Sequence, residues 1–150
     1  KTFVDSTQNI DKELYYSIYD DNIKRYKKEN RYFGDEETFE HFVSPMVESD
    51  GFYVDKCGND YKLTYKVTLD ETLTEDELQT FKDILENSFG YIEIPSKVNK
   101  LCVEINAEGE KGEYKSLYND FWCMKIKGRW YKVDKTIYNE YINLMQQTSL

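Results

Sequence analysis

The stretch "DFWCMKIKGRWYKVD", residues 120–134, decides the fold. Two short apolar segments flank Lys127-Gly128, and glycine readily takes the positive φ that a two-residue hairpin turn requires. We therefore predict a β-hairpin in which Ile126 lies opposite Arg129. Because side chains alternate along a strand, one face of this hairpin would be apolar. That face would carry Trp122, Met124, Ile126, Tyr131 and Val133.

The segment before this hairpin extends the predicted sheet. We expect one strand to end near "EGEKGE" and the next to run through "YKSLYNDFWCMKIK" without a break. Any two-residue turn within "EKGE" pairs residues whose numbers have an odd sum. Such a register places Leu101, Val103 and Ile105 on the same face as Trp122. The two hairpins thus predict one shared core face of an antiparallel sheet.

The opposite face of the sheet carries the candidate functional residues. Phe121 and Trp130 would lie there, and an exposed aromatic patch often marks a contact site. We expect the C-terminal helix to cover Trp130, since a sheet can be packed on both faces; otherwise Phe121 and Trp130 would bind a partner. Cys102 and Cys123 would share this face, and they would lie directly opposite each other if the turn were at Gly112-Glu113. We hypothesise a disulfide between these two cysteines in an oxidising compartment.

The N-terminal half shows a helical period that changes to an alternating one. Apolar residues recur every three or four positions and predict a helix over about 8–29. A second helix would start near Asp35, and Pro45 would end it early. Residues 51–56, "GFYVDK", would form a strand that pairs with the alternating segment 61–69, "YKLTYKVTL".

The clearest local signal lies in "LTEDELQTFKDILENSFG". Thr74 with Glu77 three residues later predicts a capping box, and Gly90 is suited to end the helix over 75–89. Helical spacing returns over 136–147. We find no internal repeat and no linker, so we predict one α+β domain over residues 1–150.

The composition excludes some partners. Asp and Glu outnumber Lys and Arg by 29 to 20, which gives a net charge of −9. Nucleic acid is an unsuitable partner, because binding to its backbone depends on basic groups. The acidity suits solubility or a basic partner. No apolar run approaches the ~20 residues that span a bilayer, so we expect no membrane-spanning segment in this chain.

Familiar catalytic and metal patterns are missing from the sequence. His41 is the only histidine, the three cysteines are widely spaced, and no phosphate-binding glycine loop or nucleophile motif occurs. The acidic clusters are typical of helix starts, and paired catalytic carboxylates cannot be assigned among so many acidic residues. We therefore predict no catalytic residues, no metal site and no cofactor.

The order of elements and the segment Met124-Lys125-Ile126-Lys127-Gly128-Arg129-Trp130-Tyr131 resemble the nuclear transport factor 2-like superfamily. Bacterial extracytoplasmic members of unknown function commonly end in a Val-Lys-Ile-Asp-Gly-Lys-Trp-Tyr type of strand. The resemblance covers about 8–134, and includes the capped helix with the strand expected after it. It implies a cystatin-like cone, in which a curved antiparallel sheet wraps around an N-terminal helix. The helix over 136–147 would be an extra element.

The resemblance also implies a function and a location. We expect a non-catalytic binding or accessory domain, whose partner would be a protein or a small apolar ligand, with a homodimer as a further option. We expect an extracytoplasmic protein, secreted or lipid-anchored by a signal absent from this chain; a cytoplasmic location stays open.

Two other functions stay open as well. The main alternative is a small-ligand-binding protein, or an isomerase- or dehydratase-like enzyme, that uses the cavity of the cone. A hollow interior with an ionisable group at its floor would favour this alternative, and a filled interior would argue against it. The third is an acidic protein that neutralises a basic partner.

Overall fold

The structure is a computed structural model that describes residues 1–30 and 35–148, with only the backbone described for part of helix α4. Within these residues the fold is α+β and consists of six helices and an open antiparallel sheet of five strands. The elements are α1 (Thr2–Asn9), α2 (Lys12–Tyr16), α3 (Asp21–Glu29), α4 (Asp35–Cys57), β1 (Lys62–Thr72), α5 (Glu75–Phe89), β2 (Lys97–Gly109), β3 (Gly112–Tyr118), β4 (Cys123–Ile126), β5 (Arg129–Lys132) and α6 (Lys135–Thr148).

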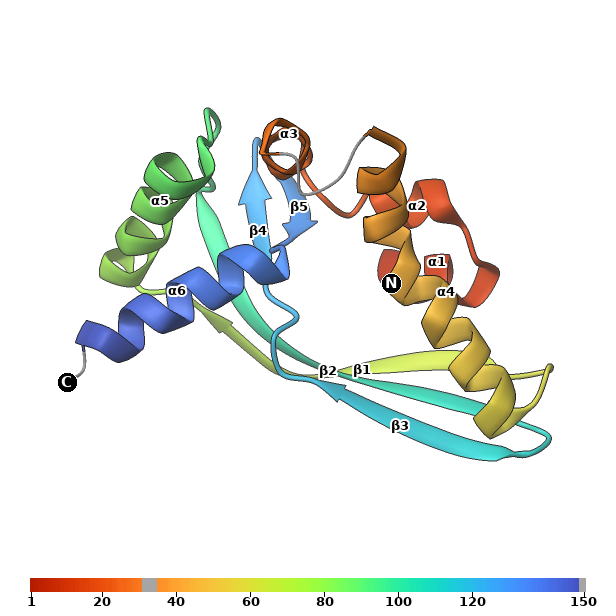
Figure 1. The fold of residues 1–150 in the computed structure, drawn as a ribbon. Helices are drawn as coiled ribbons and strands as arrows, with labels where there is room; N and C mark the ends of the chain where they lie inside the picture. Colours follow the sequence, from red (N-terminus) through yellow and green to blue (C-terminus); the bar gives the residue numbers. More distant parts are fainter. Residues whose placement is uncertain (31–34, 149–150) are drawn as a thin grey trace.

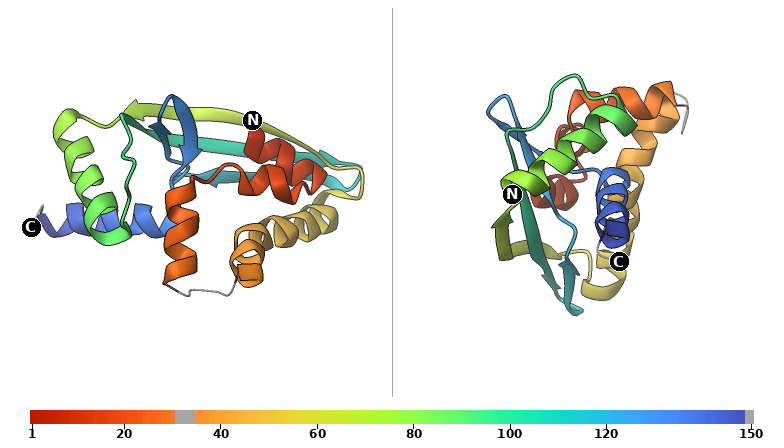
Figure 2. Two further views of the ribbon diagram at one scale, coloured as in Figure 1. Left: turned by 90° about the horizontal axis from the view of Figure 1, so that it is seen from above. Right: turned by 90° about the vertical axis from the view of Figure 1, so that its left-hand side faces the viewer.

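Strand β2 organises the sheet. It pairs with β1 along one edge, and with both β3 and β4 along the other, while β5 pairs only with β4. Helices α5 and α6 lie at one end of the molecule, and α1, α2 and α4 lie at the other (Figures 1 and 2). The short hairpin of β4 and β5 stands between these two groups of helices (Figure 1).

The predicted hairpin at Lys127-Gly128 is confirmed. Both residues have positive φ, 51° and 79°, and Ile126 lies opposite Arg129. This pair of positive φ values matches the twist of the flanking strands, which is why such two-residue turns are favoured. The backbone N–H of Val133 also donates to the carbonyl of Trp122 at 2.8 Å, so the pairing continues beyond the strands.

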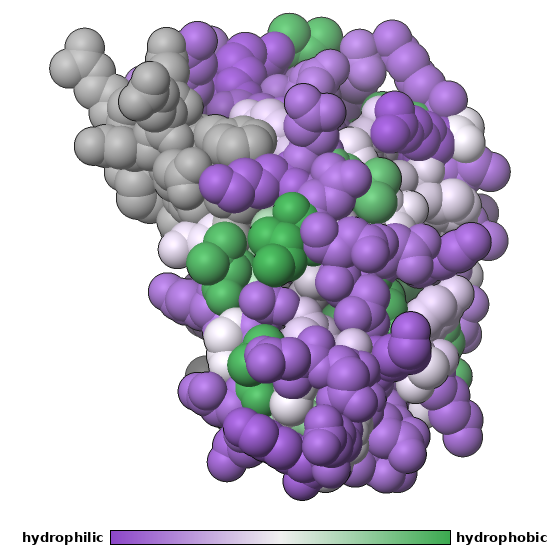
Figure 3. Space-filling view, turned by 90° about the vertical axis from the view of Figure 1, so that its right-hand side faces the viewer, coloured by the Kyte–Doolittle hydropathy of each residue, from purple (hydrophilic) through white to green (hydrophobic). Residues whose placement is uncertain are grey.

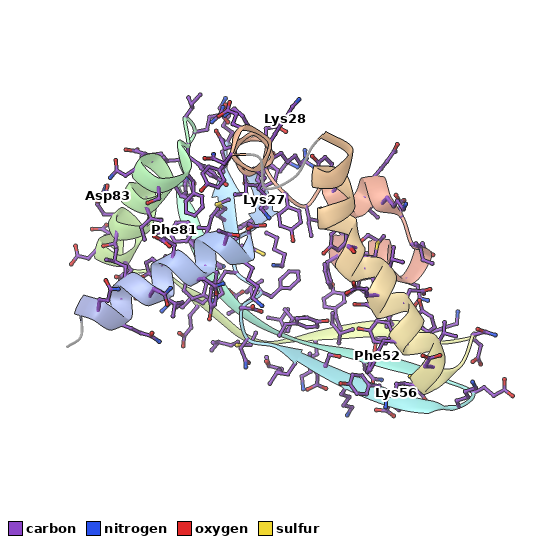
Figure 4. The ribbon with its side chains drawn as sticks, in the orientation of Figure 1. Lys27, Lys28, Phe52, Lys56, Phe81 and Asp83 are labelled. Atoms are coloured by element: carbon purple, nitrogen blue, oxygen red, sulfur yellow. The ribbon has the colours of Figure 1, made fainter. Side chains whose placement is uncertain are left out.

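The capped helix is confirmed as α5. Thr74 and Glu77 make both hydrogen bonds of a capping box, and Gly90 ends the helix in the left-handed conformation. Phe81 is fully buried between α5 and α6 (Figure 4), with its ring 5.6 Å from that of Tyr141. The expected C-terminal helix is present as α6, and its apolar positions pack on α5 and on Trp122.

The long strand predicted over 114–127 is wrong. Strand β3 ends at Tyr118 and β4 begins at Cys123, with a short irregular segment between them. The β2–β3 pairing has the expected odd sum, as in Val103 opposite Tyr118, but Met124 lies opposite Val98. The break therefore changes which residues of β2 face β4.

This break also overturns the single core face predicted for the sheet. Val103 and Ile105 pack with Val4 in one buried cluster, whereas Trp122 and Met124 belong to the main cluster, together with Val98.

Three short helices replace the single N-terminal helix predicted over 8–29. Ile10 ends α1 with a positive φ of 51°. The carboxylate of Asp11 then caps α2, and that of Asp20 caps α3 by accepting from the N–H of Ile23. Acidic side chains that bond to backbone N–H groups start new helices, so they interrupt a pattern that is otherwise continuous. The finer expectation of a cone around one long helix is not met in this region.

Helix α4 corrects two further predictions. It continues past Pro45, and it includes residues 51–56, which were expected to form a strand. A proline removes one helical hydrogen bond, and burial of Met46 and Tyr53 on the same helix offsets this cost. Tyr53 and Cys57 are both buried and lie four residues apart, as on one face of a helix. The segment is too short for this helical period to be recognised in the sequence.

Strand β1 is present as predicted, but its apolar side chains are less buried than expected. Tyr65, Val67 and Leu69 are exposed on this edge strand, and a register shift follows Val67. Where the structure describes the side chains, the face that the C-terminal part of α4 and the neighbouring end of the sheet present is mainly hydrophilic, with small separate apolar patches (Figure 3). Within the described ranges, no helix combines the length and the apolar character needed to cross a membrane.

Candidate functional site

A cavity of about 520 Å³ lies between the two groups of helices. Helices α1, α2, α3 and α4 contribute to one side of it, and the end of β3, strand β5 and the start of α6 contribute to the other. Figure 4 shows Lys27 at the centre of the molecule, between α6 and α4, whereas its neighbour Lys28 points outward. The volume lies within the range of roughly 300–1,000 Å³ that is typical of small-ligand sites.

A buried ion pair forms part of the cavity wall. Nζ of Lys27 lies 3.0 Å from Oδ2 of Asp134, and both side chains are almost fully buried. The other carboxylate oxygen of Asp134 accepts a hydrogen bond from the backbone N–H of Thr136 at the start of α6. Asp134 is therefore held by two partners and serves as a structural element of the wall.

The exposed Lys135 also lines the cavity, and Lys132 and Asp120 bring two more charges, of opposite sign, to it. Among the described residues, neither has an ion-pair partner within 4.0 Å. Nζ of Lys132 lies 5.2 Å from the ring centre of Phe121 and 5.9 Å from that of Tyr19. Burial lowers the pKa of the Lys132 ammonium, and the carboxylates of Asp120 and Asp134 oppose this shift.

Aromatic rings make up much of the remaining wall. They belong to Phe3, Tyr15, Tyr19, Tyr118 and Phe121. Tyr15 and Tyr19 share a hydrogen bond, and burial raises the pKa of both hydroxyls. These tyrosines therefore stay protonated and present polar groups on an otherwise apolar wall.

The predicted partner-binding residues are both found beside the cavity. Phe121 lines it, and Phe121 and Trp130 together line an adjoining groove. The expectation that the C-terminal helix covers Trp130 is wrong, because Trp130 is 42% exposed. Helix α6 covers Trp122 instead, with the Trp122 and Tyr138 rings 5.1 Å apart. Whether Phe121 and Trp130 bind a partner stays a prediction.

The predicted cysteine pair is not brought together. Cys123 lies opposite Asn99 on β2, three residues from Cys102, and all three cysteines are free. Three residues of a strand span about 10 Å, whereas bridged cysteines need Cα atoms within about 7 Å. The directly opposite placement expected for Cys102 and Cys123 is therefore wrong, because the hairpin turn is at Glu110-Lys111 and the chain breaks before β4.

The charged residues of the cavity were missed at the level of sequence. One signal was present: Lys27 lies four residues after Ile23, on the face predicted to be buried. Asp120, Lys132 and Asp134 gave no comparable signal, because their meeting depends on the break before β4. His41 lies among the residues whose side chains are not described. In the described parts of the chain, no group of three or more His, Cys, Asp or Glu is placed to hold a metal ion.

Comparison with protein-family models found no match for this chain. Comparisons with the curated proteins and with the solved structures found no match either.

Proposed function

We propose that this protein binds a small zwitterion with an apolar side chain, such as a free aromatic amino acid, in the central cavity. The observation that carries the proposal is the pair of opposite charges at Lys132 and Asp120. Both line one cavity, and neither has an ion-pair partner among the described residues. Both side chains are half-buried, and the ammonium of Lys132 donates to the carbonyl of Val133 at 3.4 Å. A charge that is partly removed from water gains from a close counter-charge, so a ligand that supplies both counter-charges would bind favourably.

The rest of the wall suits the rest of such a ligand. The rings of Tyr15, Tyr118 and Phe121 offer contact to an apolar or aromatic side chain. The Lys27–Asp134 pair neutralises itself, so it adds no net charge. The carboxylate of the ligand would lie at Lys132, and its ammonium group would lie at Asp120.

The cavity supports the small-ligand alternative over the accessory-domain hypothesis. It does not by itself favour an enzyme. Asp134, the most buried carboxylate of the wall, is already paired with Lys27 and bonded to the backbone of Thr136, and no other feature of the cavity assigns it a proton to abstract. Membership of the nuclear transport factor 2-like superfamily and an extracytoplasmic location stay predictions.

Isothermal titration with three related compounds tests the proposal. L-phenylalanine has both charges, N-acetyl-L-phenylalanine lacks the ammonium group, and L-phenylalanine amide lacks the carboxylate. We expect the wild type to bind phenylalanine about tenfold more tightly than either blocked compound, since one hydrogen bond to a charged group contributes about 1.5–3 kcal/mol. This comparison needs no variant, so it does not depend on how well a mutant folds.

Variants then assign each charge to its partner. Lys132→Met should bind phenylalanine and its amide equally, and Asp120→Asn should bind phenylalanine and its N-acetyl derivative equally. Lys28→Met and Asp83→Asn make the same changes of charge on outward-facing residues (Figure 4) and should behave as the wild type. Absence of phenylalanine binding, or equal binding of all three compounds by the wild type, would contradict the proposal.

A further inference from the structure

A second compartment adjoins the central cavity on the side of the β4–β5 hairpin. This outer groove has a volume of about 270 Å³ and is lined by the start of α1 and by Phe121, Arg129, Trp130 and Lys132, among others. Its described lining contains three basic residues, Lys1, Arg129 and Lys132, and no acidic residue. Such a lining contrasts with the net charge of −9 of the whole chain.

Arg129 and Trp130 contribute a positive charge and apolar surface to the outer groove. The guanidinium of Arg129 lies 5.2 Å from the ring centre of Tyr131, an arrangement that holds a cation over an aromatic face. The indole of Trp130 is partly exposed in the same groove. An anionic group with some apolar surface therefore fits this compartment better than a cation does.

The outer groove and the central cavity share part of their walls. Phe3, Phe121 and Lys132 line both compartments. The ammonium group of Lys132, which lies over the Phe121 ring, therefore stands at the boundary between them. A ligand in either compartment can place an acidic group against Lys132.

We propose that the two compartments together bind a short peptide, with an aromatic N-terminal residue in the central cavity and an acidic second residue in the outer groove. The inference rests on the proposed function, because it starts from an amino acid whose ammonium group lies at Asp120. The chain of a peptide continues from the carboxyl carbon of its first residue, and that carbon would lie beside Lys132. The carboxylate of the first residue becomes an amide in a peptide, so an acidic side chain on the second residue replaces it. This residue enters the outer groove, where Lys132 and Arg129 bind its side-chain carboxylate.

Titration of the dipeptides Phe-Glu and Phe-Lys tests the inference. They share the aromatic residue and differ in the charge of the second side chain. We expect the wild type to bind Phe-Glu about tenfold more tightly than Phe-Lys, as a charge-assisted bond to Arg129 predicts. Arg129→Gln should remove this preference and leave the affinity for free phenylalanine unchanged. Lys127→Gln, which removes the same charge at the hairpin tip outside the groove, should keep the preference.

The outcomes separate the two proposals. If phenylalanine binds but Phe-Glu and Phe-Lys bind equally, the peptide inference is wrong and the amino-acid proposal stands. The same conclusion follows if Arg129→Gln retains the preference for Phe-Glu. If neither phenylalanine nor the dipeptides bind, both proposals are wrong.

Discussion

The ammonium group of Lys27 and a carboxylate oxygen of Asp134 lie 3.0 Å apart, although the two residues are separated by 107 positions in the sequence. Both side chains are buried, so removal of one charge leaves the other in a poorly solvated position. The pair joins α3 to the start of α6 across the wall of the central cavity.

Replacement of Lys27 by methionine should therefore destabilise the protein strongly. Removing one partner of a buried ion pair costs about 3–5 kcal/mol in the free energy of unfolding. Urea denaturation measures this change. Lys28→Met is the matched control, since Lys28 is exposed on the same helix, and it should stay within about 0.5 kcal/mol of the wild type. Equal effects of the two substitutions would show that the pair contributes nothing specific.

Features that depend on a few neighbouring residues could be predicted from the sequence. The capping box depends only on Thr74 and Glu77, and the hairpin turn depends on Lys127 and Gly128. Each signal is local and has one structural solution. The capped helix and the hairpin register were therefore predicted correctly.

Features that depend on distant contacts could not be predicted. The change of register between β3 and β4 follows from a few irregular residues before Cys123. Continuation of the β2–β3 register would pair Met124 with Lys97, whereas Met124 lies opposite Val98. A shift of one residue sends every later side chain to the other face of a strand. The central cavity was missed for the same reason, because Lys132 reaches it only in the observed register.

The two glycines Gly128 and Gly51 should respond in opposite ways to replacement by alanine. Gly128 has a φ of 79°, where a Cβ atom causes strain, so Gly128→Ala should lower the free energy of unfolding by about 1 kcal/mol. Gly51 lies within α4, and an added Cβ would have no atom within 4 Å. Gly51→Ala should raise stability by about 0.4–1 kcal/mol. A stabilised Gly128→Ala or a destabilised Gly51→Ala would contradict the backbone described for that site.

Glu77 should make stability depend on pH in the acid range. The hydrogen bond from the backbone N–H of Thr74 is the main cause that lowers the pKa of Glu77, and Lys100 adds to it. In the unfolded chain the pKa of Glu77 returns to its ordinary value of about 4.5. Between the lower folded pKa and this value, the unfolded state binds more protons than the folded state does. The contribution of ionised Glu77 to the free energy of unfolding is therefore fully present above about pH 4.5. It is lost as the pH falls through the lower folded pKa.

Urea denaturation between about pH 3 and pH 6 measures this dependence. Glu77→Gln should flatten the curve, whereas Glu75→Gln, in the same first turn of α5, should retain the slope of the wild type. An unchanged slope in Glu77→Gln would mean that the capping box does not carry the effect.

The three cysteines should all be alkylated without reduction. The register keeps Cys102 and Cys123 apart, so denatured, unreduced protein should take up three labels by mass spectrometry, and reductant should add none. In the folded protein, burial raises the pKa of the Cys123 thiol to about 11. Since the thiolate is the reactive form, labelling of Cys123 should accelerate about tenfold for each unit of pH between about 7 and 9. The difference in labelling between the wild type and Cys123→Ser gives the part that is due to Cys123. Uptake of only one label before reduction would instead establish a disulfide and overturn the observed β2–β4 register.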